Sequence, residues 1–561
     1  MNLDIKEIPF SRFGSYFCVS QEKDSENVYI RDVHGGDAAP SKLFQLDFVK
    51  DGVEKEYGIR ASEVSVIFFL KEEPEQIAAE IIISEEDELH IEVRDVELRL
   101  RATKVKYDSI MEIEDGMYEY HIYPKELKLM VINLTGQWSV EAPWNIIGND
   151  FIDMRLKNGH FVLESYRTVY EKKEYLTFSQ GKAQVERLYE EWFNTMKRGY
   201  TQSNYLPSVE RASYITWSSV VHPDGLLKDY AMYMSKLWMY NIWSWDNCFN
   251  ALNLGEEYPE LAYAQLKTFM DNQDASGAYP DFVNDKFISY NCIKPPVFAY
   301  IYEQLMERND YFKDEQRLRA VYESTKKVMN YFELYRTYPG RLPHYKHGND
   351  SGWDNASLFH EGMVVEAPDL ASFLIRTYDI LSSFANRLGE NEESEGFVSK
   401  ADALFTLLLE RLYDDVGFYG RVGKNAEKIT VRSSLILRLP VIIGYRLDKS
   451  LMDRLVADLE ANFETRYGLA TESIYSSYYK EDGYWLGPIW APVTYLFIDS
   501  LKRYGYEETG NRLRDKFLDL TLVGGMAENF DPHTGTGLVD TSFTWTSSVF
   551  LVLLEDNLRG D

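Results

Sequence analysis

The chain has 561 residues and an acidic composition, with 90 Asp and Glu against 60 Lys and Arg and a formal net charge of −30. Hydrophobic residues make up 45% of the chain, which excludes global disorder, and the length allows two or more domains with cores of their own. The negative charge argues against nucleic acid and anionic membranes as partners, because its field repels polyanions.

The cysteines and the first residues bear on location. Cys18, Cys248 and Cys292 form neither a CxxC pair nor a disulfide framework. The start, MNLDIKEIPF, has no apolar core of a signal peptide, and no uninterrupted apolar stretch reaches the roughly 20 residues that span a bilayer. We therefore expect a cytoplasmic protein without a membrane segment.

Residues 1–170 are predicted to form an antiparallel β-sandwich domain. Short runs rich in Val, Ile, Tyr and Phe, many with alternating polarity as in His90–Val93, are separated by charged or glycine-bearing turns. Residues 171–204 are predicted to be a helical linker, because Gly181–Lys197 is amphipathic at helical spacing.

Helical patterns follow one another from residue 205 to residue 561. We expect a dozen helices, near 206–221, 229–241, 246–254, 257–272, 292–308, 314–336, 367–388, 395–412, 449–463, 488–504, 506–520 and 542–555. Six helical hairpins in a double ring need this number, and no repeat of fixed period points to an α-solenoid.

The loops between these helices combine Trp or Tyr with carboxylates and amides, which suits sugars with their apolar faces and directional hydroxyls. Glycoside hydrolysis needs two carboxylates, and desolvation beside a Trp raises the pKa of a carboxyl group as a general acid requires. Asp246, Asp354 and Glu528 are the leading candidates. For Asp246 alone, an equal alternative is that it caps the following helix.

Four motifs in this order, WSWDNCFNAL, SGWDNASLF, YWLGPIWAPVTYL and ENFDPHTGTG, resemble glycoside hydrolase family 63 and, more distantly, the trehalases of family 37. The resemblance covers roughly residues 205–555. It implies an (α/α)6 toroid catalytic domain over 205–561 that inverts α-glycosides, so that the whole chain is mainly α. It also implies that Asp354 is the general acid, that Glu528 is the general base and that Asp246 holds sugar hydroxyls. Further substrate-binding positions carried over in the same way are Trp245, Gln273, Trp353, Trp485 and Trp490.

Several features stand outside this resemblance or depart from it. Leu486 occupies a position where the family commonly has Arg. His344, His347 and His360 lack metal-ligand spacing and are expected to have surface or hydrogen-bonding roles. Gly535–Gly537 lacks the context of a phosphate loop. No metal and no cofactor are expected, and a structural calcium ion among loop carboxylates has no support in the sequence.

The expected function is hydrolysis of small α-glycosides by inversion, with α-glucosidase as the first expectation. Mannosylglycerate or glucosylglycerate hydrolase and trehalase are enzymatic alternatives. A catalytically silent carbohydrate-binding protein is the alternative from another class, and the presence of both Asp354 and Glu528 counts against it. The expected partner is a small carbohydrate, and the sequence does not specify an oligomeric state.

Overall fold

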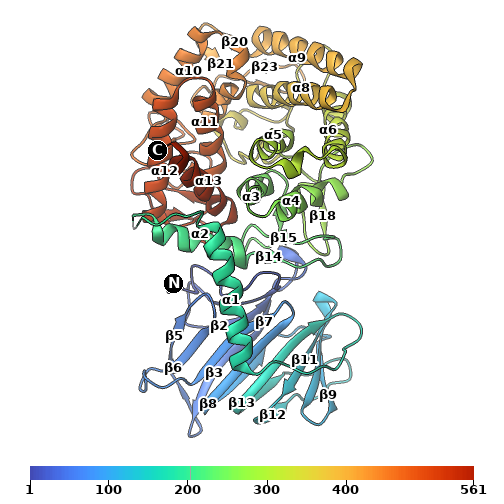
Figure 1. Ribbon diagram of the computed structural model, residues 1–561, viewed down its shortest axis with the longest axis vertical. Coiled ribbons are helices and arrows are strands. Elements are labelled where there is room, and N and C mark those ends of the chain that lie inside the picture. Colours follow the sequence, from blue (N-terminus) through green and yellow to red (C-terminus); the bar gives the residue numbers. More distant parts are fainter. Residues whose placement is uncertain (203, 561) are drawn as a thin grey trace. The chain divides into compact units, whose positions relative to one another are not determined.

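The computed structural model describes residues 1–202 and 204–560, and this part of the chain separates into two compact units (Figure 1). Unit 1 comprises Met1–Thr201, Ser213–Asn241 and Asn284–Phe287, and unit 2 comprises the rest of the described chain. Two later segments therefore join the N-terminal region in one unit.

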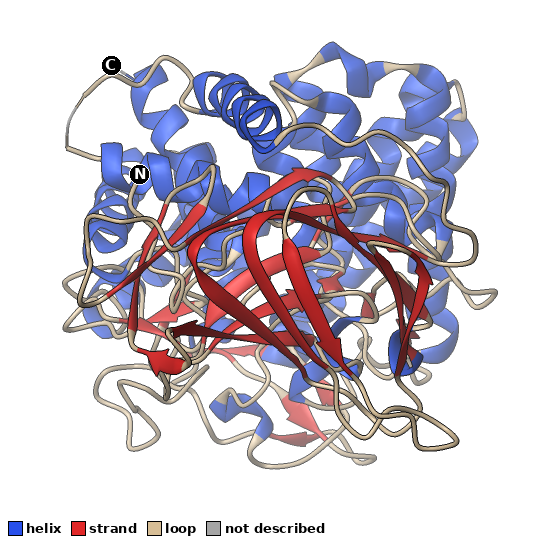
Figure 2. Ribbon diagram, turned by 90° about the horizontal axis from the view of Figure 1, so that it is seen from below, coloured by secondary structure: helices blue, strands red, loops and turns tan. Residues whose placement is uncertain are grey.

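The core of unit 1 is a thirteen-stranded antiparallel sheet (Figure 2). Its path runs β1-β2-β3-β8-β13-β11-β10-β9, with β12 on β13, β4 on β3, and β5, β6 and β7 attached through β8. The strands are β1 Phe17–Gln21, β2 Val28–Asp32, β3 Lys42–Lys50, β4 Val53–Lys55, β5 Tyr57–Ala61, β6 Val66–Leu70, β7 Ala79–Glu85, β8 Glu88–Ala102, β9 Ser109–Glu114, β10 Met117–Ile122, β11 Leu127–Asn133, β12 Gln137–Glu141 and β13 Asp153–Tyr166. Two short 3₁₀ turns, Gly36–Ala38 and Tyr123–Lys125, interrupt this order.

The long strands β8 and β13 connect the two halves of the sheet. β8 pairs with β7 along its first half and with β3 along its second half, and it pairs with β13 along both. The helix α1 (Phe178–Met196) covers part of this sheet and packs on β7 and β8. It begins at a capping box in which the Thr177 and Gln180 side chains each bond the other residue's backbone N–H.

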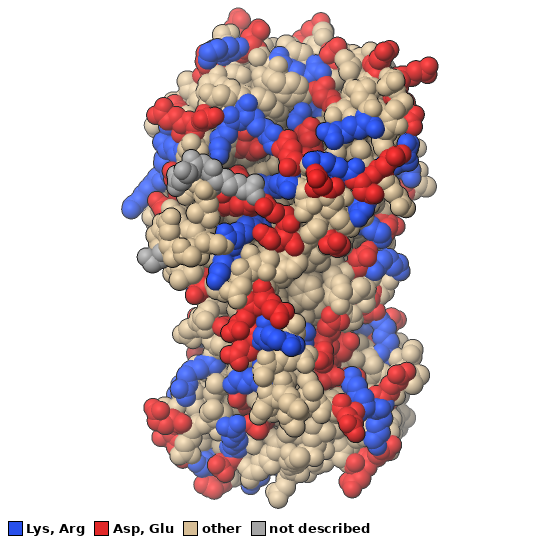
Figure 3. All heavy atoms as spheres, viewed as in Figure 1, with Lys and Arg blue, Asp and Glu red and all other residues tan. Residues whose placement is uncertain are grey.

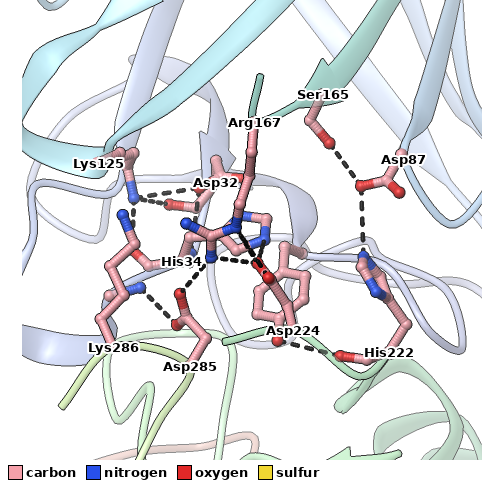
Figure 4. A network of polar contacts seen from close by, with 12 residues as sticks. Asp32, His34, Asp87, Lys125, Ser165, Arg167, His222, Asp224, Asp285 and Lys286 are labelled. Carbon is pink, nitrogen blue, oxygen red and sulfur yellow. Dashed lines mark hydrogen bonds and ion pairs between the residues drawn. The ribbon is translucent and has the colours of Figure 1, made fainter. Parts of the chain in front are cut away.

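A partly buried ion-pair cluster ties the separate segments of unit 1 together (Figure 4). We call it the His34 cluster; it consists of Asp32, His34, Lys125, Arg167, Asp224 and Asp285. His34 bonds Asp32 through Nδ1 at 2.8 Å and lies 3.2 Å from Asp224 through Nε2. Asp285 accepts the backbone N–H of Gly35 at 2.7 Å. The later segments thus supply two of the three carboxylates.

Unit 2 is built from helices that alternate between an inner and an outer position, an order that can be followed in Figure 1. The inner elements α3, α5, α8, η5, α11 and α13 each pack on the next, and α13 packs on α3, which closes a ring of six. Outside it, α4, α6, α9, α10 and α12 pack on the inner elements, and the first turn of α2 meets α12 through Ser208 and Thr521.

The bounds of these helices are α2 Leu206–Ser218, α3 Asp246–Leu254, α4 Pro259–Asp271, α5 Phe298–Arg308, α6 Glu315–Tyr335, α7 Gly348–Ser351, α8 Pro368–Leu388, α9 Asn391–Leu412, η5 Leu435–Arg446, α10 Lys449–Asn462, α11 Ala491–Arg503, α12 Glu507–Gly524 and α13 Thr544–Gly560. Two more 3₁₀ turns are Asp310–Lys313 and Ser357–Phe359. Every residue of α3 is buried, whereas the outer helix α9 buries one narrow stripe, as expected for inner and outer layers.

Short two-residue strands lie between the helices after residue 205, and β14 and β15 among them belong to unit 1. They are β14 Val220–Val221, β15 Ala231–Met232, β16 Ile242–Trp243, β17 Phe282–Val283, β18 Ile288–Ser289, β19 Val365–Glu366, β20 Tyr413–Asp414, β21 Gly417–Phe418, β22 Arg421–Val422, β23 Glu427–Lys428, β24 Ile489–Trp490, β25 Asn529–Phe530 and β26 Gly537–Leu538. The sheets β16-β17-β18 and β24-β25-β26 lie next to residues predicted to carry the chemistry.

One helix prediction is wrong, and one inner element of the ring was not predicted. The segment 229–241 is irregular apart from β15, and most of its apolar side chains, with the exception of Trp238, are buried. The inner ring instead uses η5, a 3₁₀ segment kinked at Ile443, which has Pro440 inside it and so lacks a helical signature. The predicted dozen therefore contains one helix that the structure lacks, and it omits η5 and the four-residue helix α7.

Two properties of the whole chain complete the description. On the face drawn in Figure 3 acidic and basic side chains are interspersed, so the net charge does not gather there in a single patch. None of the helices among the described residues has the length and apolar character needed to cross a membrane.

Candidate active site

The predicted carboxylates all lie in unit 2, each next to a short strand or the end of a helix. Asp246 is the first residue of α3, directly after β16, and Asp281 precedes β17, the partner of β16. Asp354 follows α7, and Glu528 precedes β25, which pairs with β24. Asp246, Asp354 and Glu528 are near enough for charge coupling, because Asp246 interacts with each of the other two.

Asp246 is buried, and desolvation raises the pKa of its carboxyl group to about 8. The nearby Lys294 acts in the opposite direction, while Asp281 and Asp354 add to the rise. Its side chain makes no capping bond at the start of α3, where the N-cap position belongs to Trp245. Asp246 is therefore a desolvated carboxyl at the site and does not fit the alternative of a helix N-cap.

Two glycines give the Asp354 loop its path. Gly352 ends α7 with φ 71°, and a Cβ there would lie 2.7 Å from the ring of Trp245. A Cβ on Gly348 would lie 1.9 Å from the carbonyl oxygen of Asp354. The chain can approach this closely only without side chains at both positions. Burial raises the pKa of Asp354, and the charges of Lys294 and His347 oppose the rise.

Glu528 has one occupied and one open carboxylate oxygen. The hydroxyl of Tyr484 donates to Oε1 at 2.9 Å, while Oε2 is buried and has no hydrogen-bond partner among the described residues. The Glu528 backbone N–H donates to the carbonyl of Asp540 at 2.7 Å, which fixes the turn. Burial, followed by the charge of Asp540, raises the pKa of Glu528 to about 8, and the Tyr484 bond opposes this.

Lys294 supplies positive charge to this group of carboxylates. Its Nζ lies 3.3 Å from Oδ1 of Asp281 and donates to the carbonyl oxygen of Asn349 at 2.8 Å. Burial lowers its pKa, but Asp281, Asp354 and Asp246 together keep the pKa above its usual value. The sequence analysis assigned no role to Lys294, Asp281 or Tyr484. A single lysine inside the apolar run CIKPPVF was the available signal for Lys294.

The predicted tryptophans form one buried aromatic cluster next to these carboxylates. Trp485 and Trp490 stack with ring centroids 3.9 Å apart, and Trp353 lies 4.9 Å and Trp245 6.3 Å from Trp485. The Nε1 of Trp353 is buried without a hydrogen-bond partner in the part of the chain that the structure describes. The cluster is a rigid wall with at least one donor available to a ligand.

Gln273 lies apart from this cluster. Its side-chain amide donates to the carbonyl oxygens of Gly277 and Ser324 and accepts from the Ser324 hydroxyl. None of these hydrogen bonds reaches Asp354 or Glu528. Its observed bonds brace the loop after α4, and its assignment to substrate binding stays a prediction.

Asn355 joins the loop of the predicted acid to the loop of Tyr484. Its Nδ2 donates to the Gly483 carbonyl at 3.0 Å, and its Oδ1 accepts from the Trp485 backbone N–H at 2.9 Å. Leu486, at the position where the family commonly has Arg, is buried in the same loop. One amide thus fixes the distance between the segments carrying Asp354 and Tyr484.

Comparison with known proteins agrees with this arrangement. The family model described as mannosylglycerate hydrolase MGH1-like glycoside hydrolase domain matches residues 239–546. The mannosylglycerate hydrolase of Rubrobacter radiotolerans is 25% identical over 401 residues, which cover 56% of this chain and 90% of that protein.

Solved structures show the same fold. A family 63 mannosylglycerate hydrolase from Thermus thermophilus, in complex with Tris and D-glycerate, has a TM-score of 0.51 and 20% identity, covering 61% of this chain and 98% of that one. A bacterial glucoamylase in complex with acarbose has a TM-score of 0.64 and 10% identity, covering 99% and 94%.

These similarities confirm the predicted fold class, an N-terminal antiparallel β-sheet region followed by an (α/α)6 helical domain. The family match spans the loops that carry Asp246, Asp354 and Glu528, and it identifies the chain as an enzyme that hydrolyses glycosidic bonds. The chain belongs to the MGH1-like glycoside hydrolases of glycoside hydrolase family 63.

Proposed function

We propose that the chain is an inverting α-glycosidase acting on small α-glycosides of glycerate, with mannosylglycerate as the first substrate to test. The main support for this chemistry is the carboxylate of Glu528, whose Oε1 accepts a hydrogen bond from Tyr484 while its buried Oε2 has no partner among the described residues. A general base needs such an unpaired oxygen to accept a proton from the attacking water. The similarity to mannosylglycerate hydrolases over most of a relative's length supports the substrate class.

In the proposed mechanism Asp354 donates a proton to the glycosidic oxygen while Glu528 removes a proton from the water that attacks the anomeric carbon. The raised pKa of Asp354 favours the protonated form that an acid needs, whereas the pKa of about 8 of Glu528 means that this base becomes mostly ionised only above pH 8. Asp246 holds hydroxyls of the sugar. Inversion requires room for the water, so the two catalytic carboxyl groups should be about 6.5–9.5 Å apart when substrate is bound.

The specificity test is a panel of mannosylglycerate, glucosylglycerate, trehalose and α-linked glucose disaccharides. A higher kcat/KM for either glycerate than for the disaccharides supports the proposal. A higher kcat/KM for an α-linked glucose disaccharide supports α-glucosidase activity instead. NMR of the first-formed sugar should show the β anomer, and a predominant α anomer excludes inversion. A protein that cleaves nothing in the panel is the silent carbohydrate-binding alternative.

The roles are tested by Asp354→Asn and Glu528→Gln, each expected to lower kcat by about a hundredfold to ten-thousandfold. The exposed neighbours Asp482→Asn and Glu481→Gln are matched controls and should keep normal turnover. Near-normal activity of either catalytic variant removes that residue from its role. We include a cytoplasmic location in the proposal, in keeping with three free cysteines.

A further inference from the structure

Three side chains of types that can bind metals lie close together near the Asp354 loop. One of them comes from a distant part of the sequence. The Sγ of Cys292, a ring nitrogen of His347 and a carboxylate oxygen of Asp350 all lie within 4.8 Å of one another. Cys292 is in the loop between β18 and α5, while His347 precedes α7 and Asp350 lies in it. None of the three has a part in the proposed hydrolysis.

Two of these side chains have free ligand atoms. Cys292 is an unpaired thiol, and neither its sulfur nor the His347 ring has a hydrogen-bond partner among the described residues. Both side chains are half-buried, so solvent ions can reach them. His344 and His360 are not part of this group; His344 stacks on Tyr338, and Nε2 of His360 bonds the carbonyl of Asn355.

Asp350 is held in a fixed orientation. Its Oδ2 accepts from Arg336 at 2.6 Å and from the Lys346 backbone N–H at 2.7 Å, while Oδ1 accepts from the Ile293 backbone N–H at 3.0 Å. A carboxylate oxygen that accepts one bond keeps a second lone pair. Carboxylates that bind metals are usually oriented by such outer hydrogen bonds.

We propose that Cys292, His347 and Asp350 form a binding site for a divalent ion of the zinc class. Thiolate, imidazole and carboxylate are the ligand types that Zn²⁺ accepts, and three protein ligands leave a fourth position for water. Bond lengths of about 2.0–2.3 Å place tetrahedral ligand atoms roughly 3.5 Å apart. The ligand atoms of the three side chains therefore need to move by about 1 Å to complete the site. Binding releases the thiol proton to solvent.

The site is mechanically connected to the proposed acid. Residues 347–350 pack against the Asp354 backbone through Gly348, and the carbonyl of Asn349 accepts the bond from Lys294. A bound ion fixes this segment and adds positive charge beside the group that must hold a proton. Resting on the proposed function, this predicts that zinc inhibits turnover and that a chelator restores it.

The test measures binding directly on the full chain after chelator treatment and dialysis. Titration with Co²⁺ should give one ion per chain and a thiolate-to-cobalt charge-transfer absorption, and Zn²⁺ should displace the cobalt. Cys292→Ser and His347→Gln, which break no described hydrogen bond, should each weaken zinc binding tenfold or more. His121→Gln, a partly exposed imidazole in unit 1, is the control and should bind as the unaltered chain does.

The results separate this proposal from the hydrolase assignment. Absence of the charge-transfer band, or equal affinity in the unaltered chain and Cys292→Ser, overturns the metal site. Zinc binding without any hydrolytic activity leaves the site standing and contradicts the proposed function instead. Inhibition that persists in both ligand variants places the inhibitory ion elsewhere and overturns the link to Asp354.

Discussion

Two neighbours change the pKa of Glu528 in opposite directions. The Tyr484 hydroxyl stabilises the carboxylate, whereas the charge of Asp540 destabilises it. Tyr484→Phe should therefore raise the Glu528 pKa above its value of about 8, and Asp540→Asn should lower it. Because the base must be ionised, the acid limb of kcat/KM moves to higher pH in the first variant and to lower pH in the second.

The pH dependence of kcat/KM in the two variants is the measurement, because it reports groups of the free enzyme. Opposite displacements of the same limb are expected, with the alkaline limb little changed. Displacement of both variants in one direction contradicts the assignment of that limb to Glu528. The exposed Asp482→Asn serves again as the control and should leave the profile unchanged.

Lys294 is predicted to act on stability through its carboxylate neighbours. Lys294→Gln leaves the buried Asp281 without its cation, and breaking such a pair costs about 3 kcal/mol of unfolding free energy. Asp281→Asn in addition removes the uncompensated charge, so the double variant should recover part of the loss. Urea denaturation of the four proteins in a double-mutant cycle measures this coupling.

A matched surface pair sets the baseline for that cycle. Lys449 and Asp453 are 2.9 Å apart and exposed, so Lys449→Gln should change stability by less than about 0.5 kcal/mol. Strictly additive losses for Lys294→Gln and Asp281→Asn would show that the two side chains do not depend on each other.

At this scale sequence patterns find carboxylates but not their partners. Asp246, Asp354 and Glu528 could be singled out because each stands in a loop rich in aromatic or amide residues, and the structure brings them together. Lys294 and Tyr484 come from other loops, and their contacts depend on the closed ring. The convergence of Cys292 with His347 likewise has no expression in local spacing.

The helices show where periodicity is sufficient and where it fails. Amphipathic outer helices such as α6 and α10 were predicted within two residues at each end, because one face is polar. The inner element η5 is apolar except for Arg438 and its last two residues, and it contains Pro440, so neither period nor propensity marks it. The segment 229–241 has helix-like composition, but most of its residues, 231–237 above all, are buried in unit 1. Tertiary burial decides both cases.

A helix end sets the path of the Asp354 loop, and two glycines allow a controlled test of it. Gly352 and Gly389 both end helices with a left-handed backbone, at φ 71° and 79°. A Cβ on Gly389 meets nothing within 4 Å, whereas one on Gly352 meets the Trp245 ring. Gly389→Ala should cost about 1–2 kcal/mol, and Gly352→Ala should cost more and also lower kcat.

Chemical denaturation and steady-state kinetics of both variants check this. The larger effect is expected because Trp245 is backed by Trp485 and Trp545 and cannot move aside. Equal losses of stability in the two variants, with normal kcat in both, would mean that backbone strain alone accounts for the glycine at position 352.

For the whole molecule, the organisation into units follows contacts that composition cannot reveal. The change of period near residue 205 marks where strands give way to helices, but unit 1 also includes 213–241 and 284–287. Asp224 and Asp285 in these segments look like ordinary loop carboxylates in the sequence. Their role is visible only where the His34 cluster joins them to Asp32 and Arg167 (Figure 4).

The His34 cluster balances three carboxylates against three cations only when His34 is protonated. Asp32 and Asp224 hold both ring nitrogens, and they raise the pKa of His34 to about 9 against the lowering effect of burial. His222, Asp87, Lys286, Tyr16 and Tyr233 also face this group. A charged His34 therefore stabilises unit 1 at neutral pH.

Because folding raises the pKa of His34, loss of the charge on His34 makes the protein less stable as the pH rises. The folded pKa of about 9 lies above the value of 6.5 for an unfolded histidine, so the stabilisation is complete below pH 6.5 and is lost as the pH rises through 9. At about 1.4 kcal/mol for each pH unit, the loss amounts to roughly 3 kcal/mol. His34→Gln should be less stable at pH 7 and should lose less on going to pH 9.5. Urea denaturation at both pH values measures the difference, with His121→Gln as the control that keeps the full alkaline loss. If the unaltered chain and His34→Gln lose the same free energy between these pH values, the charge on His34 is not what holds the three segments of unit 1 together.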